Sequence, residues 1–218
     1  MNRRFESHLV WGPHSPLALL TGLGLVILSS SRLAFAITCT GALLWVNSLS
    51  ALIFSCGRSF LPERGKMAVL LFLTSFLCGL FMFLIGLINP LLVMMTGFLL
   101  ILIPPYCLGS GFFEASISEY PIEVFSRAVL EALILGALII AFSLIREPLG
   151  MRTLSFPGGP EGLMELFPFG EKETILPVQI MSMSSGGLLL LGYCIALFRY
   201  FKERNGSIPR NNDTEEER

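Results

Sequence analysis

A cysteine on interrupted backbone is the residue in this sequence best suited to chemistry. Cys107 stands in the segment 104–111, which reads Pro-Pro-Tyr-Cys-Leu-Gly-Ser-Gly. Because proline lacks a backbone N–H and glycine disfavours a helix, we expect main-chain amides here to be free and to point at the thiol. Such amides stabilise a thiolate or a bound iron–sulfur cluster. Cys107 is therefore the first candidate for a metal or cofactor ligand.

The remaining side chains of metal-binding type give weaker signals. The other cysteines are Cys39, Cys56, Cys78 and Cys194, all within or at the ends of apolar segments. They form no CxxC pair and no His/Cys cluster, and buried free cysteine usually acts as a small apolar residue. His8 and His14 precede the first apolar segment, with no carboxylate or cysteine at ligand spacing. We expect no metal site from either histidine.

Ionisable residues inside a membrane are functional candidates, and Glu131 and Glu114 come closest to that depth. Glu131 follows Arg127 by four residues, so an ion pair on one helix face, at the edge of the membrane, accounts for it. The sequence contains no G-x-x-x-x-G-K-[ST], G-x-G-x-x-G, G-x-S-x-G or H-E-x-x-H motif. These absences exclude the usual nucleotide sites and the common hydrolase and dehydrogenase sites, and leave transport, electron transfer or assembly.

The composition indicates what must position these residues. The chain of 218 residues is 53% hydrophobic and 14% charged, with a mean hydropathy of +0.72, whereas soluble domains carry about 25% charge. Apolar runs long enough to cross a bilayer, which takes roughly 20 residues, predict an all-α polytopic membrane protein of about six helices. The approximate segments are 16–29, 33–56, 67–87, 91–109, 128–145 and 178–198. A net charge of −1 and a pI of about 6.1 indicate no nucleic-acid partner.

Two of the six segments are predicted to be broken. The first has only 14 residues, roughly 21 Å of helix, and contains Gly22 and Gly24; the fourth is interrupted by Pro104 and Pro105 and followed by Gly109 and Gly111. Broken helices at matching positions favour two inverted three-helix repeats, about 11–87 and 88–198. The alternative is that Gly and Pro are simply common in membrane helices.

Residues 1–205 are expected to form one integral membrane domain, and 206–218 a disordered polar tail in the cytoplasm. Eleven basic residues fall on the side of the N-terminus and four on the other, which favours cytoplasmic termini. The first set is Arg3, Arg4, Arg58, Arg64, Lys66, Arg127, Arg199, Lys202, Arg204, Arg210 and Arg218, and the second is Arg32, Arg146, Arg152 and Lys172. The connector 146–177 is expected to be an external loop with a short amphipathic turn. A cleavable signal peptide is the alternative for the N-terminus, but the apolar run continues beyond Leu33.

Over roughly residues 11–192 the sequence resembles the membrane subunits of Rnf and Na⁺-translocating NADH:quinone reductase complexes, the RnfA/RnfE and NqrD/NqrE family, and most closely RnfE/NqrD. Cys107, Gly111 and Glu114 keep the family's spacing. The family's R-E-x-x-G-x-G-T-L stretch after the fifth helix is similar to residues 146–154, with Arg152 in place of a Gly. The sixth helix resembles P-P-G-A-F-I-x-L-G, reduced to Ser-Ser-Gly-Gly at 184–187 with Gly192 retained.

The sequence also departs from the family. The cysteine of the family's L-G-L-C motif in the first broken helix is replaced by Gly24, and the Arg before its Ala-Glu pair by Phe112. The resemblance implies two paired subunits of opposite orientation, each giving two cysteines to one 2Fe-2S cluster. Cys107 is then one ligand, and Cys39 in the second helix is the weak substitute for the other.

The resemblance implies a subunit of an Rnf/Nqr-type ion-translocating electron-transport complex in the bacterial inner membrane. We expect it to serve as a helical scaffold and transmembrane electron relay, beside a homologous partner and other Rnf/Nqr-like subunits, and to carry no NADH site. Two alternatives stay open. One is a cofactor-free structural subunit of such a complex, which the missing cysteine favours, and the other is a small secondary transporter.

Overall fold

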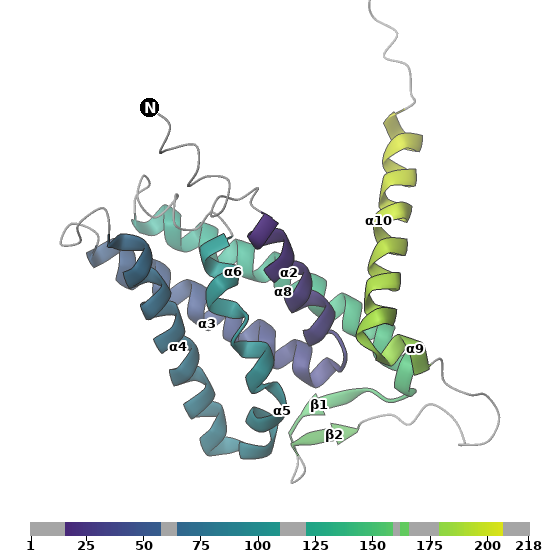
Figure 1. Ribbon diagram of the computed structural model, residues 1–218, viewed down its shortest axis with the longest axis horizontal. Helices are drawn as coiled ribbons and strands as arrows, with labels where there is room; N and C mark the ends of the chain where they lie inside the picture. The colour runs from purple at the N-terminus through teal and green to yellow at the C-terminus, as the bar shows by residue number, and fades with distance from the viewer. Residues whose placement is uncertain (1–15, 58–64, 110–120, 159–161, 166–178, 207–218) are drawn as a thin grey trace, which may run out of the picture.

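The computed structural model describes residues 16–57, 65–109, 121–158, 162–165 and 179–206 (Figure 1). These residues are mostly helical, which confirms a helical protein. Within them, four helices are long and apolar enough to cross a membrane, namely Leu33–Gly57, Lys66–Ile88, Pro90–Gly109 and Ile122–Met151. The two other apolar helices, Leu20–Ser29 and Ser184–Leu197, are shorter. The predicted membrane-embedded class is therefore supported by helix length and composition.

The longest helices form the centre of the bundle. α3 (Leu33–Gly57) packs along α8 (Pro121–Met151), and Figure 1 shows the two running diagonally side by side. A Cβ on Gly136 of α8 would lie 2.3 Å from Thr40 Cγ2 of α3, so only glycine allows this approach. Small residues at such crossings let two membrane helices pack closely. α4 (Lys66–Ile88) covers the other side of α3.

The first segment is α2 (Pro16–Ser29), and its length matches the prediction. The predicted break at Gly22 and Gly24 is wrong, because α2 continues through both residues. The physical reason is that glycine tolerates a helix at a modest cost, whereas proline removes a hydrogen bond. Leu25, Val26 and Ile27 of α2 are buried, and this packing supports the helix.

The fourth segment is interrupted as predicted, but earlier than predicted. α5 (Pro90–Leu100) ends in a turn at Ile101 and Leu102, and α6 (Ile103–Gly109) follows. Pro104 and Pro105 lie in the first turn of α6, where the N–H groups have no acceptor within the helix. Pro104 cannot donate to Leu100 O, and Cys78 Sγ of α4 donates to that carbonyl instead, at 3.2 Å. Gly109 ends α6, and Gly111 lies outside the described residues.

The fifth segment is longer than predicted and is followed by a small hairpin. α8 extends to Met151, so it includes Arg146 and Glu147, which we expected in a loop. The strands β1 (Ser155–Pro157) and β2 (Leu163–Glu165) then pair antiparallel, with Ser155 opposite Glu165. These strands were not predicted from the sequence. The predicted disordered tail and the rest of the connector lie outside the described residues.

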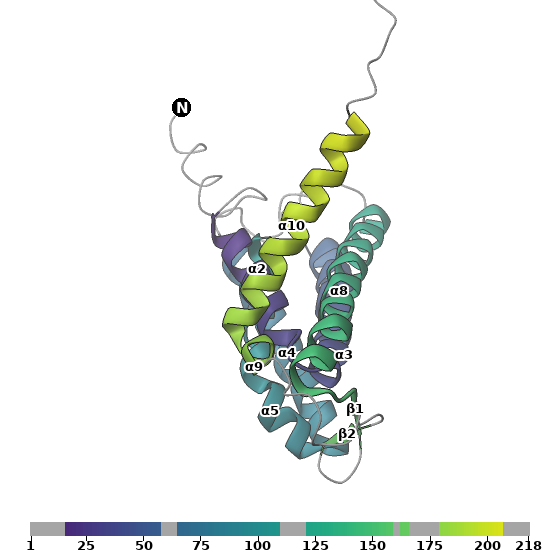
Figure 2. The ribbon, with the colours of Figure 1, turned by 90° about the vertical axis from the view of Figure 1, so that its right-hand side faces the viewer.

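The sixth segment has a short first part, α9 (Gln179–Ser182), and a long second part, α10 (Ser184–Gly206). Among the described elements, α10 contacts mainly α9 and α2. Figures 1 and 2 show α10 extending away from the bundle. In both views the beginning of α2 and the end of α10 lie toward the same end of the molecule. The hairpin, α9 and the α4–α5 corner lie at the opposite end.

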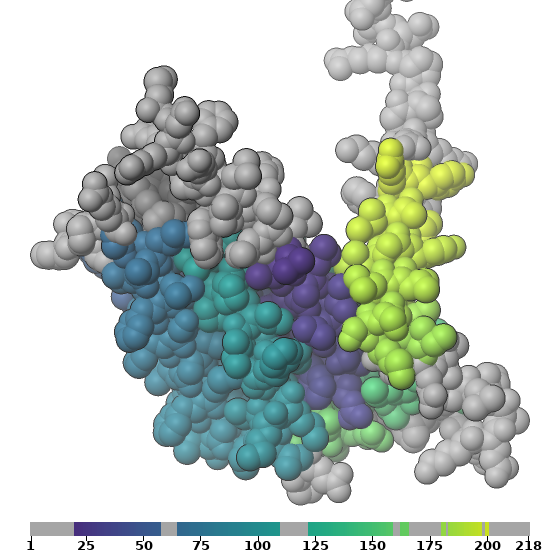
Figure 3. Space-filling model, in the orientation of Figure 1, coloured from purple at the N-terminus to yellow at the C-terminus, as the bar shows by residue number. Residues whose placement is uncertain are grey.

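The surface is rich in large apolar side chains. Phe72 and Phe83 of α4, Met94 and Phe98 of α5 and Leu189 of α10 are all more than 60% exposed. The space-filling view shows α4, α5 and α10 together on one face (Figure 3). A surface of this kind suits the hydrocarbon core of a bilayer and is rare on soluble monomers.

Candidate functional site

Cys107 lies inside α6 rather than on irregular backbone, and it is completely buried. Its Sγ donates to Asn47 Oδ1 of α3 at 2.9 Å, and Asn47 itself is only 2% exposed. The expectation of irregular backbone at Cys107 is therefore wrong, because the helix restarts before Cys107 and includes it. In this arrangement the thiol is a hydrogen-bond donor that pairs with a polar group of the core.

The residues expected to complete a ligand set with Cys107 lie on neighbouring helices. Cys39 of α3 is 1% exposed and belongs to the same apolar cluster as Cys107. On α2, a Cβ at Gly22 would touch the ring of Tyr106 at 3.6 Å, so α2 packs against the helix that carries Cys107. A Cβ at Gly24 would have no atom within 4 Å. Residue 24 thus has room for a side chain but supplies no ligand.

The resemblance implies two cysteine ligands from each subunit, and the chain fits that pattern poorly. One position carries Gly24, and the thiol at the other, Cys107, is hydrogen-bonded to Asn47. No group of three or more His, Cys, Asp or Glu side chains able to hold a metal ion occurs among the described residues.

Arg146 forms the most polar centre that the structure describes. Although it stands on an apolar helix, it is only 1% exposed, and its guanidinium reaches two other segments. Nε donates to Met181 O of α9 at 2.7 Å, and Nη2 donates to Met183 O, between α9 and α10, at 2.7 Å. Nη1 donates to Ile27 O of α2 and to Ser30 Oγ, the latter at 3.1 Å. One side chain therefore joins the first, fifth and sixth segments.

Glu147, the next residue, is equally buried and binds elements on another side of α8. Its Oε2 accepts from the N–H of Leu33 at 2.7 Å, and its Oε1 accepts from the N–H of Ser155 in β1 at 2.8 Å. Leu33 is the first residue of α3, and the first N–H groups of a helix lack partners within it and carry its positive dipole end. Glu147 therefore stabilises the start of α3 and fixes the hairpin beneath it.

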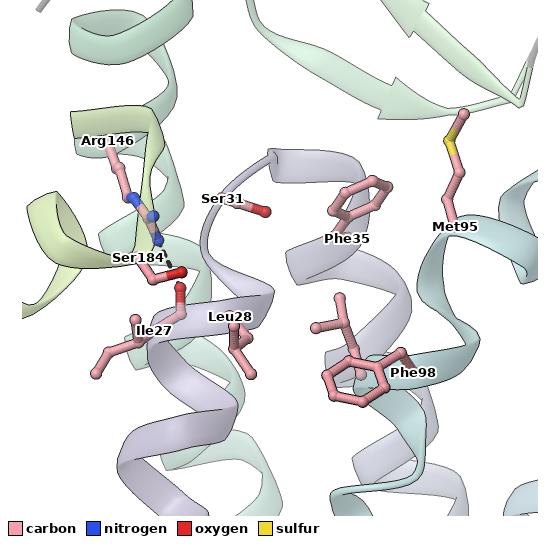
Figure 4. A pocket seen from close by; sticks show the side chains of 9 residues that line it. Ile27, Leu28, Ser31, Phe35, Met95, Phe98, Arg146 and Ser184 are labelled. Carbon is pink, nitrogen blue, oxygen red and sulfur yellow. Dashed lines mark hydrogen bonds between the residues drawn. The ribbon is translucent and has the colours of Figure 1, made fainter. Parts of the chain in front are cut away.

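A pocket of about 230 Å³ lies beside Arg146. Arg146, Ser31 and Ser184 are its polar residues, and the rest of its lining is apolar, consisting of Ile27, Leu28, Phe35, Met95, Phe98 and Leu99. Figure 4 shows Arg146 and Ser184 on one side and Met95 and Phe98 of α5 on the other. The side of α5 is thus apolar, whereas the side of Arg146 combines polar groups with the apolar Ile27 and Leu28.

The fold brings together the two stretches that carry the resemblance in the second half of the chain. A Cβ at Gly187 of α10 would lie 3.0 Å from Arg146 Nη1, so the glycine lets α10 approach the guanidinium. Arg152, which stands where the family has Gly, follows the end of α8 with a φ of 56°. Its N–H donates to Pro148 O at 3.2 Å, as in a helix end that favours glycine.

No family model matches the chain, and no curated protein matches it.

The predicted pair of Arg127 and Glu131 is confirmed, with Nε and Oε1 3.5 Å apart at a partly exposed position. Glu114, Phe112, His8 and His14 lie outside the described residues. The buried roles of Arg146 and Glu147 were missed, because both were assigned to a loop. The available signal was two adjacent opposite charges at the end of an apolar run, a position where burial requires dedicated partners.

Proposed function

We propose that this chain is a membrane subunit of an Rnf/Nqr-type ion-translocating electron-transport complex, in which it serves as a helical scaffold. The observation that carries the proposal is the contact between the two motif stretches, residues 146–154 and 184–187. They lie about 30 residues apart in sequence and meet at the guanidinium of Arg146. The left-handed backbone of Arg152 adds support, since the family has glycine there.

The proposal includes six membrane crossings in two inverted repeats. The crossings are α2, α3, α4, α5 with α6, α8, and α9 with α10. Two of the three pairs of corresponding segments pack on each other, α3 on α8 and α2 on α6, as expected near the axis of a pseudo-two-fold. The broken helices at matching positions do not add support, because α2 is continuous and only the opening segment of the second half is interrupted.

The proposed location is the bacterial inner membrane, with both termini in the cytoplasm. The support is the excess of Lys and Arg, eleven against four, on the side of the termini. Lys66 at the start of α4 and Arg127 near the start of α8 belong to that majority. The proposed partners are a homologous subunit of opposite topology and further Rnf/Nqr-like subunits, within the lipid bilayer.

Between the scaffold and the electron relay, the contacts of Cys107 favour the scaffold. To bind iron, its thiol would have to leave Asn47 and the apolar cluster around it. A relay would also need a ligand in place of Gly24. A cofactor-free subunit needs neither change.

The test is purification of the chain, with an affinity tag at its C-terminus, from the membranes of its source organism in mild detergent. The proposal expects mass spectrometry to find a homologous membrane subunit and flavin-carrying subunits in the same particle. Isolation of the chain alone, with solute uptake after reconstitution, would instead favour the transporter and overturn the proposal.

Iron separates the scaffold from the relay in the same particle. Iron, acid-labile sulfide and the EPR signal of the reduced complex are measured for the parent and for Cys107→Ser, with the exposed Cys56→Ser as matched control. If the chain is a scaffold, the parent, Cys107→Ser and Cys56→Ser should give the same iron content, sulfide content and EPR signal. Loss of iron in Cys107→Ser alone would establish the relay.

Gly24→Cys offers a gain-of-function version of this measurement. The added side chain meets no atom within 4 Å, so it should be tolerated. If a partner subunit supplies two thiols, the new cysteine should raise the iron content of the complex. The matched control is Gly22→Cys, two residues before Gly24 in α2. Its side chain would face the ring of Tyr106, and it should not raise the iron content.

A further inference from the structure

The backbone oxygens around Arg146 come from places where helices end. Ile27 lies in the last turn of α2, whose final four carbonyls lack donors within the helix. Met181 and Met183 lie at the junction where α9 stops and α10 begins. Helix C-termini carry partial negative charge, which favours a cation beside Ile27 O. Met183 O lies at the start of α10 instead, where it also accepts from the N–H of Gly187 at 3.2 Å. Ser30 Oγ adds a fourth oxygen, and its hydroxyl also donates to Ile27 O at 3.3 Å.

We propose that these four oxygens form a cation-binding cage, selective for a planar guanidinium, and that Arg146 is its tethered ligand. Among the described contacts of Arg146, the oxygens of the cage are Ile27 O, Ser30 Oγ, Met181 O and Met183 O. A guanidinium fits because its N–H groups diverge in one plane and reach several oxygens at once. A lysine ammonium is a compact point charge and would reach fewer of them.

The cage makes Arg146 a positioning residue for the sixth segment. α10 makes few contacts with the rest of the bundle, and the guanidinium bonds at its base hold the α9–α10 junction against α2. Gly187 forms one wall of the cage, since a Cβ there would lie 3.0 Å from Nη1 and 3.1 Å from Cζ of Arg146. This inference does not depend on iron or on the identity of the complex.

Chemical rescue tests the cage. The full chain with Arg146→Ala is purified in detergent, and its thermal unfolding is followed by circular dichroism with increasing guanidinium chloride in the millimolar range. Loss of the buried cation should lower the midpoint by roughly 10 °C. Added guanidinium should restore part of that loss and reach a plateau, whereas tetramethylammonium should not. Arg127→Ala, which removes an arginine of the same helix that is 56% exposed, is the matched control and should not respond.

The cage would be overturned if guanidinium did not raise the midpoint of Arg146→Ala, or if the rise did not saturate. A rise with tetramethylammonium, or a rise in Arg127→Ala, would also overturn it. Arg146→Lys provides a further check, because an ammonium should leave the midpoint well below that of the parent. A lysine variant as stable as the parent would contradict the planar geometry.

If Arg146→Ala does not fold, substitutions of two glycines of α10 test the cage. Gly187→Ala should displace the guanidinium and lower the midpoint by a few degrees, whereas Gly192→Ala, with nothing within 4 Å of its Cβ, should not lower it. Equal effects of the two substitutions would overturn the proposal. If the double variant Arg146→Ala, Gly187→Ala folds, Gly187→Ala should lower the midpoint less in the Arg146→Ala background than in the parent.

Discussion

Two buried polar centres in this molecule differ in what they hold together. At Arg146 and Glu147, charged side chains bind backbone atoms of α2, α3, β1 and the α9–α10 junction. At Cys107, a thiol donates to the neutral amide of Asn47 inside an apolar cluster. The first centre joins segments by their ends, while the second joins α6 to the middle of α3. Arg146 and Glu147, which lie in a stretch similar to the family's motif, thus make the stronger polar network. Cys107, the residue expected to do chemistry, makes the weaker one.

The energies of hydrogen bonds predict how far the two centres should differ. A bond to a charged group contributes about 1.5–3 kcal/mol, and a bond between neutral groups about 1 kcal/mol. The charged centre also satisfies helix ends that would otherwise be buried without water, as membrane depth requires. Substitutions there should therefore cost more free energy of unfolding than substitutions at Cys107.

The largest effect is expected for Glu147→Ala. It leaves the N–H groups of Leu33 and Ser155 buried without their acceptor, which should lower the free energy of unfolding by about 2–5 kcal/mol. Thermal unfolding in detergent micelles, followed by circular dichroism, measures the loss. Glu123→Ala, at an exposed position in the first turn of α8, is the control and should change little. Equal effects of the two variants would contradict the buried role of Glu147.

A smaller effect is expected for Cys107→Ala. Removing the thiol leaves Asn47 Oδ1 without its donor and opens a small void, at a cost of about 1–3 kcal/mol. Cys107→Ser keeps a donor of similar size and should lose less. The same unfolding measurement distinguishes them. If both variants are as stable as the parent, Cys107 does not hold α6 to α3, and its thiol is available for a ligand.

Much of the fold could be predicted from the sequence, because apolar runs of membrane length have few alternatives to a helix. Among the described residues the predicted segments are mostly helical, and α2 and α3 agree closely with 16–29 and 33–56. Four helices are long and apolar enough to cross a membrane. The errors arose where local propensity was the only guide. Tertiary packing keeps α2 helical through Gly22 and Gly24, and α6 accepts Pro104 and Pro105 because they fall in its first turn.

The candidate site could be predicted only in part. Cys107 was found from its neighbours in sequence, but its partner Asn47 lies 60 residues away on another helix. Arg146 and Glu147 were read as loop charges because an apolar run was expected to stop before them. Their partners are mostly main-chain atoms of distant segments, and main-chain atoms leave no signal in the sequence. Such contacts need the three-dimensional arrangement.

Arg152→Gly should be mildly stabilising at the end of the charged centre. A non-glycine residue at φ 56° is strained, and glycine relieves this at some cost in backbone entropy. The expected gain is about 1 kcal/mol. A matched control is Arg152→Ala, which removes the same side chain but keeps the strain. A gain common to both variants would trace the effect to the arginine side chain instead of the backbone.

The smallest effect is expected for Gly24→Ala, and it tests the continuity of α2. In a regular helix with nothing within 4 Å of the new Cβ, alanine should raise the free energy of unfolding by about 0.5–1 kcal/mol. A broken segment with left-handed backbone at this residue would give the opposite sign, since a Cβ there costs about 1–2 kcal/mol. Gly22→Ala should also stabilise, although less, because its Cβ touches the Tyr106 ring at 3.6 Å. If both alanines destabilised the protein, the prediction of an interrupted first segment would hold. A site beside Cys107 would then again be expected.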